Sequence, residues 1–296
     1  MKRLKNMRKW IFFVVVGLLA GCDAEGLKGT LKIAITDSPV DAKNVRDVNI
    51  VITNIEGMQD GTWKSFRNFE QPIGVNLLDY IGDRSVLLID QFSNPGEYSS
   101  IGIKLNMASR NSSLIVNPQS NIVFSDGSST PLYMPEGTAH EIILDYKLGI
   151  SSRGITNLTL DFDARKSIRK NENGEFILSP VIRIVDTNNA GHIRISTTKK
   201  TPPAQVAVHA YKKGSFNQTE TVSQDGITFR NTVTSNAIKS EKTTLGFLEA
   251  GVYDLIFVKY NELGEVLEVL GRESEVEVNK GETVDVIVDL NQLGPV

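Results

Sequence analysis

The chain has 296 residues, 23% of them charged, a formal net charge of −3 at pH 7 and a single cysteine. One thiol cannot form a disulfide within the chain, so the fold must depend on buried apolar surface. The acidic balance argues against nucleic acid as a partner, because phosphate binding needs clustered Lys and Arg.

The first 21 residues have the pattern of a signal peptide. Five basic residues precede an apolar run from Trp10 to Ala20, which is shorter than the about 20 apolar residues of a membrane-spanning helix. The run ends in "LAGC", which resembles the bacterial lipobox. This resemblance implies cleavage before Cys22, acylation of its thiol by a chain such as palmitate, and a lipidated tether over 22–28. A lone buried thiol is the alternative.

These features predict an exported protein that a lipid anchor holds in the cell envelope. We expect the outer membrane of a Gram-negative bacterium, and Asp23, directly after Cys22, leaves the inner membrane as the alternative. Removal of the leader lowers the number of Lys and Arg from 32 to 27 against 35 Asp and Glu, so the mature chain has a net charge of −8.

Beyond the tether the chain alternates apolar and polar residues with period two, which is typical of half-buried antiparallel strands. The first such segment, Thr30 to Thr36, places every second side chain on an apolar face. Only Ser85 to Phe92 suggests a short helix. Asp-Gly and Asn-Gly pairs between segments favour tight hairpins. Further alternating segments lie at 48–52, 101–105, 158–162, 206–208, 256–258 and 284–288.

The chain is predicted to be all-β, with two tandem antiparallel β-sandwiches of the Ig-like or transthyretin-like kind. The turn-forming stretch "DTNNAG", 186–191, divides a domain at 29–187 from one at 191–296. "PGEYSSIGIKLN" from Pro95 matches "AGVYDLIFVKYN" from Ala250 at a constant offset of 155. This favours related domains, although a Gly-x-Tyr strand entry is also a common structural device.

Several stretches of the first domain resemble a known family of bacterial lipoproteins. They are "ITDSPVD" from Ile35, "NPGEYSSIGIKL" from Asn94 and the run from "LTLDFDARKSI" at Leu158 to "LSPVIRI" at Leu178. They are similar to the domain of unknown function numbered 4382, and the resemblance implies a β-sandwich without an established activity. "LEAGVYDLIFV" and "NKGETVDVIVDL" in the second domain resemble transthyretin-like or carboxypeptidase-regulatory-like modules.

The acidic pair Asp161 and Asp163 is the most prominent candidate site. In a strand the two carboxylates share one face with their Cα atoms about 7 Å apart, and two like charges attract a hard cation such as Ca²⁺. Asp37 and Asp41 complete such a site if their loop folds beside Asp161. The simpler interpretation, which we favour, is a solvated strand surface on which nearby cations neutralise the pair. These cations are Arg165, Lys166 and Arg169.

Three aromatic residues are candidates for a binding surface: Trp63, Tyr133 and Tyr146, of which the last two belong to the long insertion between 106 and 154. No nucleophile elbow, phosphate-binding loop or dinucleotide fingerprint is present in the sequence. The sequence therefore predicts a non-enzymatic binding or adhesion module for a glycan or protein, without a cofactor. The alternatives are a calcium-dependent hydrolase or sugar site at Asp37, Asp161 and Asp163, and a purely structural spacer.

Overall fold

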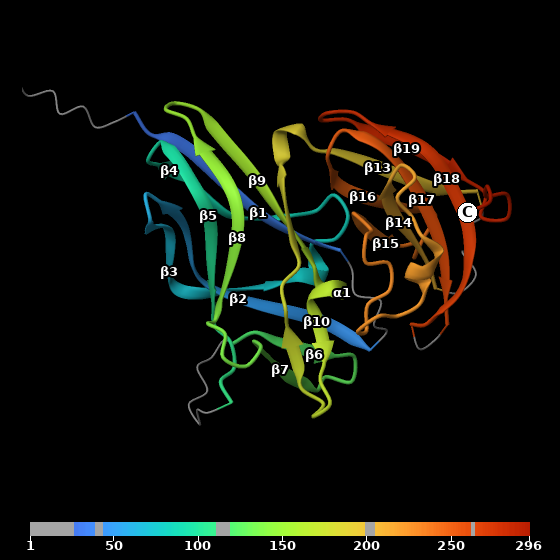
Figure 1. Ribbon diagram of the computed structural model, residues 1–296, viewed down its shortest axis with the longest axis horizontal. Helices are drawn as coiled ribbons and strands as arrows, with labels where there is room; N and C mark the ends of the chain where they lie inside the picture. Colours follow the sequence, from blue (N-terminus) through green and yellow to red (C-terminus); the bar gives the residue numbers. More distant parts are fainter. Residues whose placement is uncertain (1–26, 39–43, 111–118, 199–204, 262–263) are drawn as a thin grey trace, which may run out of the picture.

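The computed structural model describes residues 27–38, 44–110, 119–198, 205–261 and 264–296. Nearly all regular structure in these residues is β-strand, and the all-β prediction is confirmed. The first domain lies on the left in Figure 1 and the second, in orange and red, on the right. None of the helices in the described ranges has the length and apolar character needed to span a membrane.

The first domain packs a small sheet against a large one. Its elements are β1 (Gly29–Ser38), β2 (Val45–Gln59), β3 (Thr62–Asn76), η1 (Leu77–Asp79), β4 (Val86–Ser93), β5 (Gly96–Leu105), β6 (Asn121–Phe124), β7 (Ser129–Tyr133), β8 (Glu141–Ile150), β9 (Ile155–Asp163), α1 (Ala164–Ser167), β10 (Ile168–Lys170), β11 (Phe176–Leu178) and β12 (Ile182–Asp186). The small sheet has the order β12-β9-β1-β4. The large sheet has the order β10-β11-β7-β6-β2-β5-β8, and β3 pairs with β2 beside this path.

The alternation of β1 shows how the sequence builds the core. Leu31, Ile33 and Ile35 are buried and face the large sheet, where they join one apolar cluster with residues such as Ile50 and Ile101. Burial of each aliphatic side chain of this size is worth about 1.5–3 kcal/mol. The intervening side chains of β1 point to the other face of the small sheet, which the second domain covers in part.

Two details of the strand prediction are corrected. The segment Ser85 to Phe92 is not a helix, because β4 pairs antiparallel with β1 from Gly29↔Ser93 to Ile35↔Val86 and satisfies its backbone there. The sheets are also not purely antiparallel, since β1 and β9 run parallel, as do β7 and β11. Side chains alternate with period two in parallel and in antiparallel strands alike, so the sequence pattern cannot distinguish the two kinds of pairing.

The second domain repeats this plan in a smaller form. Its elements are η2 (Thr187–Asn189), β13 (Gly191–Thr197), β14 (Val206–Lys212), η3 (Gln218–Thr221), β15 (Thr234–Ala237), β16 (Lys242–Leu248), β17 (Gly251–Tyr260), β18 (Val266–Val278) and β19 (Thr283–Val288). The sheet β16-β13-β19 packs against the sheet β15-β14-β17-β18. The sheet partners change between β12 and β13, where η2 joins the two domains.

Both domains use the same strand connections around the repeated Gly-x-Tyr motif. The first strand of each domain, β1 or β13, lies between a parallel strand from later in the chain, β9 or β19, and the antiparallel strand directly before the motif, β4 or β16. Gly96 and Gly251 have φ values of 143° and 155°, which favour glycine. The hydroxyl of Tyr98 donates to Asn94 O at 3.0 Å and that of Tyr253 donates to Glu249 O at 2.8 Å. The sequence repeat is therefore a repeat of structure.

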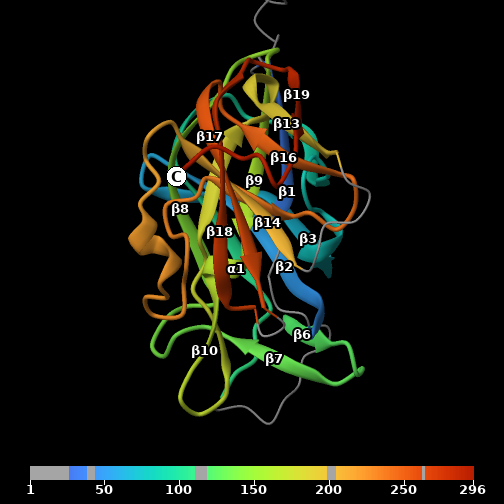
Figure 2. The same cartoon turned by 90° about the vertical axis from the view of Figure 1, so that its right-hand side faces the viewer.

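The long axis of the first domain has two distinct ends. In Figures 1 and 2, β1 begins at one end, while β6, β7 and β10 lie at the opposite end. The pair β6–β7 comes from the insertion between β5 and β8, and β10–β11 follows α1; both pairs extend the large sheet beyond β2. We call the end formed by β6, β7, β10 and β11 the sheet tip.

Candidate functional site

The acidic pair lies at the end of β9, where the strand turns into α1. Asp163 caps this single helical turn, since its carboxylate accepts a hydrogen bond from Lys166 N at 3.0 Å. Asp37, at the end of the neighbouring β1, accepts one from Ala164 N at 2.9 Å. The carboxylates of Asp37 and Asp163 thus hold the backbone of the first turn of α1.

The prediction that the acidic pair lies on a solvated surface is wrong, because Asp161 and Asp163 are 4% and 6% exposed. The inward side chains of β9 fill the core of the first domain, and the second domain covers the outward face of β9 around Asp161 and Asp163. The neutralising cations are partly those expected. Lys166 Nζ lies 3.0 Å and Arg165 Nη2 3.8 Å from Asp163 Oδ2, whereas Arg169 is exposed on β10.

Asp161 has a partner that the sequence analysis missed. Arg183, its cross-strand neighbour on β12, donates from Nη2 to Asp161 Oδ2. The signal was present in the run "LSPVIRI", where Arg183 alternates with the apolar residues of a strand, but its pairing with β9 was not predictable from spacing. Burial raises the pKa of Asp161, and the Arg183 guanidinium opposes this rise.

Three basic side chains of the first domain reach backbone carbonyls of the second. Lys166 Nζ donates to Thr232 O at 2.8 Å, and Arg183 Nη1 donates to Phe247 O at 2.6 Å. Arg165 donates to the carbonyls of Thr228 and Phe229. Each cation therefore neutralises or lies near a carboxylate in its own domain and binds the other domain with its remaining N–H groups. We call this cluster of Asp161, Asp163, Arg165, Lys166 and Arg183 the junction cluster.

Burial shifts the pKa values of two members of the junction cluster, Asp161 and Lys166, and their oppositely charged neighbours oppose both shifts. The pKa of Lys166 is lowered by desolvation, while the charge of Asp163 beside it acts in the opposite direction. Loss of either member of a pair leaves a buried charge without compensation, which is far more costly than the net worth of the intact pair. The cluster is therefore sensitive to the removal of single partners.

Backbone contact closes the junction beside the cluster. A Cβ atom on Gly246 of β16 would lie 1.9 Å from the carbonyl oxygen of Gly82, which belongs to the loop after η1. Val185, Ala190 and Phe247 form a small buried apolar cluster at the same place. The two domains approach so closely here that there is room only for glycine at position 246.

A cavity of about 200 Å³ remains at the junction. Its walls combine the two carboxylates with three cations and short apolar side chains. The lining residues are Asp161, Asp163, Lys166, Val181, Arg183, Arg230, Asn231, Thr232 and Val233. Among the described residues, no group of three His, Cys, Asp or Glu side chains is arranged to hold a metal ion. Asp41 lies outside the described residues, and calcium binding stays a prediction.

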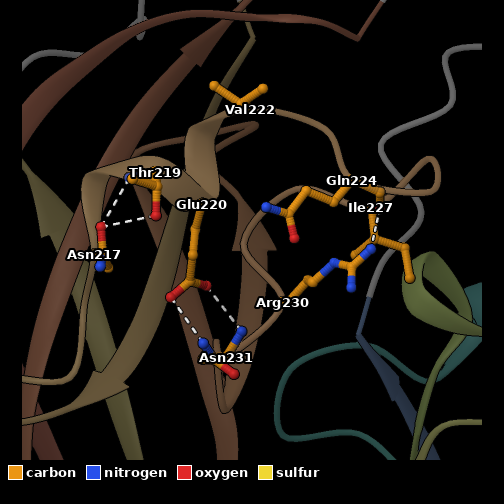
Figure 3. A pocket seen from close by; sticks show the side chains of 8 residues that line it. All are labelled: Asn217, Thr219, Glu220, Val222, Gln224, Ile227, Arg230 and Asn231. Atoms are coloured by element: carbon orange, nitrogen blue, oxygen red, sulfur yellow. Dashed lines mark hydrogen bonds between the residues drawn. The ribbon is translucent and has the colours of Figure 1, made fainter.

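A second cavity of about 200 Å³ lies in the connection between β14 and β15 (Figure 3). The Glu220 carboxylate points into the loop and accepts hydrogen bonds from the backbone and side-chain nitrogens of Asn231, at 2.9 and 3.0 Å. It also accepts one from the hydroxyl of Tyr211 at 3.0 Å, and burial raises the pKa of that hydroxyl. These bonds fix the loop that carries Thr228, Phe229 and Thr232 to the junction cluster.

His209 lies beneath this loop and was missed as a junction residue. Its Nε2 is 2.8 Å from the Tyr260 hydroxyl, and its ring stacks on that of Phe229 with 4.2 Å between centroids. Burial, followed by the charges of Arg165 and Lys166, holds its pKa well below the usual range. A neutral His209 thus supports the strand and loop against which the cations of the first domain pack.

The three predicted aromatic residues lie on three different strands. Trp63, on β3, packs its ring over Gly102 of β5. Tyr146, on β8, packs partly against the first core. Tyr133, on β7, is at the sheet tip, where the Arg110 guanidinium lies 4.6 Å from its ring centroid. The structure does not join them into one surface, and each remains a separate candidate.

Comparison with curated proteins found no match. Among solved structures, the chain is similar to the minor pilin GBS52 of Streptococcus agalactiae, with 10% identity, 87% of this chain and 94% of that chain covered, and a TM-score of 0.23. A streptococcal ancillary pilin has 9% identity, with 90% of this chain and 62% of that chain covered and a TM-score of 0.21. The fimbrial anchor protein Mfa2 of Porphyromonas gingivalis has 9% identity, with 83% of this chain and 82% of that chain covered and a TM-score of 0.19. TM-scores this low carry no argument about function.

The family comparison is more specific. The family model that matches the chain does not extend into the second domain, whose resemblance to transthyretin-like or carboxypeptidase-regulatory-like modules stays a prediction beyond its all-β fold. For the first domain, the resemblance seen in the sequence is confirmed. Because residues 28–180, more than half of its length, match the family model described as Domain of unknown function (DUF4382), the chain belongs to that family.

Proposed function

We propose that this protein is a non-enzymatic, lipid-anchored component of the cell envelope that binds a glycan or a protein partner at the sheet tip. The lipid is attached at Cys22, in the outer membrane of a Gram-negative bacterium. The observation that carries the proposal is the placement of the sheet tip at the end of the first domain opposite to the start of β1 (Figures 1 and 2). A chain anchored before β1 presents this end to its surroundings.

The sheet tip has the chemistry of a preformed polar binding surface. Arg110 binds Glu175 at 3.2 Å while its guanidinium covers the Tyr133 ring. Hydrogen bonds from Arg110 and Asn171 lower the pKa of Glu175, so this carboxylate stays ionised. An aromatic side chain beside a charged pair suits a sugar, whose hydroxyls bind the charges while its C–H groups contact the part of the Tyr133 ring that the guanidinium leaves uncovered.

The junction cluster supports a role without catalysis. Its two carboxylates already bind cations, and those cations bind backbone carbonyls of the second domain. A general acid or a metal ligand must instead reach a substrate or an ion. We infer that the acidic pair Asp161 and Asp163 of this chain helps to hold the two domains together, and that partners bind at the sheet tip instead.

Substitution of Tyr133 by alanine is expected to reduce partner binding at least about tenfold, the usual scale of loss for one anchoring aromatic residue. The measurement is binding of the chain from Asp23 onward to a glycan array, repeated with purified envelope proteins. Trp63→Ala and Tyr146→Ala are the matched controls, because they remove the other two candidate rings away from the sheet tip. Equal losses in all three variants, or no ligand for the parent, would count against the proposal.

Substitution of Cys22 by serine is expected to move the protein from the membrane fraction to the soluble fraction. The physical reason is the loss of acyl chains, each buried CH₂ of which contributes about 0.8 kcal/mol to membrane binding. Fractionation of cells after labelling with a palmitate analogue measures both attachment and acylation. Ala24→Ser is the control, and an unlabelled parent protein would refute the anchor.

A further inference from the structure

The outward face of the small sheet has a covered half and an open half. Along β1 the outward side chains are Thr30, Lys32, Ala34 and Thr36. Ala34 and Thr36 are buried, and the single hydroxyl proton of Thr36 is shared between the carbonyl oxygens of Tyr80 and Arg84, which lie 2.9 and 2.7 Å from its Oγ1. Thr30, at the start of the strand, lies beyond this cover.

Large apolar side chains occupy the open half. Thr30 pairs with Phe92 on β4 and with Ile155 on β9, so the two side chains flank it in one row, about 10 Å apart at the usual strand spacing. They are 75% and 63% exposed, and Leu27, three residues before Thr30, is 51% exposed. Single exposed apolar residues are ordinary, but three around one strand start form a patch that favours contact with an apolar partner.

Two cations border these apolar residues. Lys28 and Arg153 are both exposed, and Arg153 N donates to Lys28 O at 3.0 Å, so their backbones are adjacent. Arg153 directly precedes Gly154 and the start of β9. We call Leu27, Lys28, Phe92, Arg153 and Ile155 the tether patch. Exposed Phe, Leu and Ile with a rim of Lys and Arg are the residues that proteins insert at the boundary between headgroups and acyl chains.

The position of the tether patch in the chain identifies its partner. Cys22 and Leu27 are five residues apart, a span of at most about 18 Å even when fully extended. A lipid on Cys22 therefore brings the tether patch to the membrane surface. We propose that the tether patch docks on the lipid bilayer, with its apolar side chains at the acyl boundary and its cations on anionic headgroups. The proposal rests on the lipid anchor proposed above, because that anchor places the membrane within reach of the tether patch.

Docking at this patch gives the anchor a second point of contact. An acyl chain alone leaves the protein free to tilt about its tether, whereas a bound tether patch fixes the first domain relative to the membrane. Since β1 begins at the end opposite to the sheet tip, the fixed orientation directs the sheet tip away from the bilayer (Figures 1 and 2). The patch thus links attachment to presentation of the proposed binding surface.

The test uses the chain from Asp23 onward, which carries no lipid and keeps every described strand because β1 starts at Gly29. It is sedimented with vesicles of phosphatidylglycerol and with vesicles of phosphatidylcholine. We expect binding to the anionic vesicles, and a loss of at least about tenfold in the Phe92→Glu/Ile155→Glu variant. Lys28→Gln/Arg153→Gln is expected to weaken binding to phosphatidylglycerol and to remove its salt dependence.

Ile287→Glu is the matched control, because Ile287 is 76% exposed on β19 of the second domain. It should bind vesicles like the parent. The proposal is overturned if the parent does not sediment with phosphatidylglycerol vesicles, if Ile287→Glu loses as much binding, or if Phe92→Glu/Ile155→Glu abolishes a dimer instead. The chain used in this vesicle test lacks Cys22 and therefore carries no acyl chain. If the cell experiment shows that Cys22 is not acylated, the vesicle result is unaffected, so the two proposals can fail separately.

Discussion

Replacement of Arg183 by methionine is expected to lower the free energy of unfolding by about 3 kcal/mol at pH 7, because it leaves the Asp161 carboxylate buried without its partner. The variant also loses the hydrogen bond from Arg183 to Phe247 O, so the two domains lose one of their connections. Urea unfolding followed by intrinsic fluorescence measures the change.

The size of this loss should depend on pH. Burial already raises the pKa of Asp161 above its ordinary value, and removal of the guanidinium that opposes this rise moves it further up. A carboxyl group whose pKa is higher in the folded than in the unfolded state costs stability above the folded pKa. That cost begins to shrink as the pH falls through this pKa and is gone below the pKa of the unfolded state. The deficit of Arg183→Met should therefore shrink towards acid pH.

Two controls separate a buried pair from an ordinary one. Arg194 pairs with Asp285 at 3.2 Å on the exposed surface of the second domain, and Arg194→Met should cost less than about 1 kcal/mol. The Asp161→Asn/Arg183→Met variant should recover most of the stability lost by Arg183→Met, because it removes the buried Asp161 charge that has lost its partner. Equal costs for the two arginines, or no recovery in the double variant, would contradict the account.

Substitution of Gly246 by alanine is expected to destabilise the junction by about 2–3 kcal/mol, the scale of overpacking by added carbon atoms. The new Cβ would overlap the backbone carbonyl of Gly82, which cannot move away as a flexible side chain can. The clash is relieved if the domains separate. Small-angle X-ray scattering should then show a larger radius of gyration, and urea unfolding should begin at a lower concentration.

Gly74→Ala is the matched control for this substitution. Gly74 also lies in a strand, β3, but the nearest atom to its Cβ position is a methyl carbon of Val51 at 4.0 Å. We expect its stability to stay within about 1 kcal/mol of the parent and its scattering to be unchanged. If Gly246→Ala matches this control in both measurements, the close contact at the junction is not what holds the domains together.

The sequence was sufficient for strands with clear alternation, such as β1, because each has one face in a core, but it was not sufficient for β4, which was expected to be a helix. Leu31, Ile33 and Ile35 predict the inward face of β1 correctly, and the turn at Asp60 and Gly61 has the positive φ values, 50° and 73°, that an Asp-Gly pair readily takes. The Gly-x-Tyr repeat also predicted a shared structural device. These signals are local, so they do not depend on how distant segments meet.

The surroundings of the acidic pair could not be predicted in this way. The alternation of β9 places Asp161 and Asp163 opposite the core whether their face meets water or a second domain. The second domain meets their cations with the carbonyls of Thr232 and Phe247, and backbone groups leave no trace in the pattern of side chains. The role of Arg183 could not be predicted either, because its contact with Asp161 depends on the register of β12 with β9.

The junction implies that the two domains unfold as one unit, and calorimetry of the chain from Asp23 onward tests this claim most directly. We predict a single transition whose calorimetric and van't Hoff enthalpies agree for the parent, and two separate transitions for the Lys166→Met/Arg183→Met variant. Two independent transitions in the parent, or one unchanged transition in the variant, would contradict the conclusion that the junction cluster joins the domains.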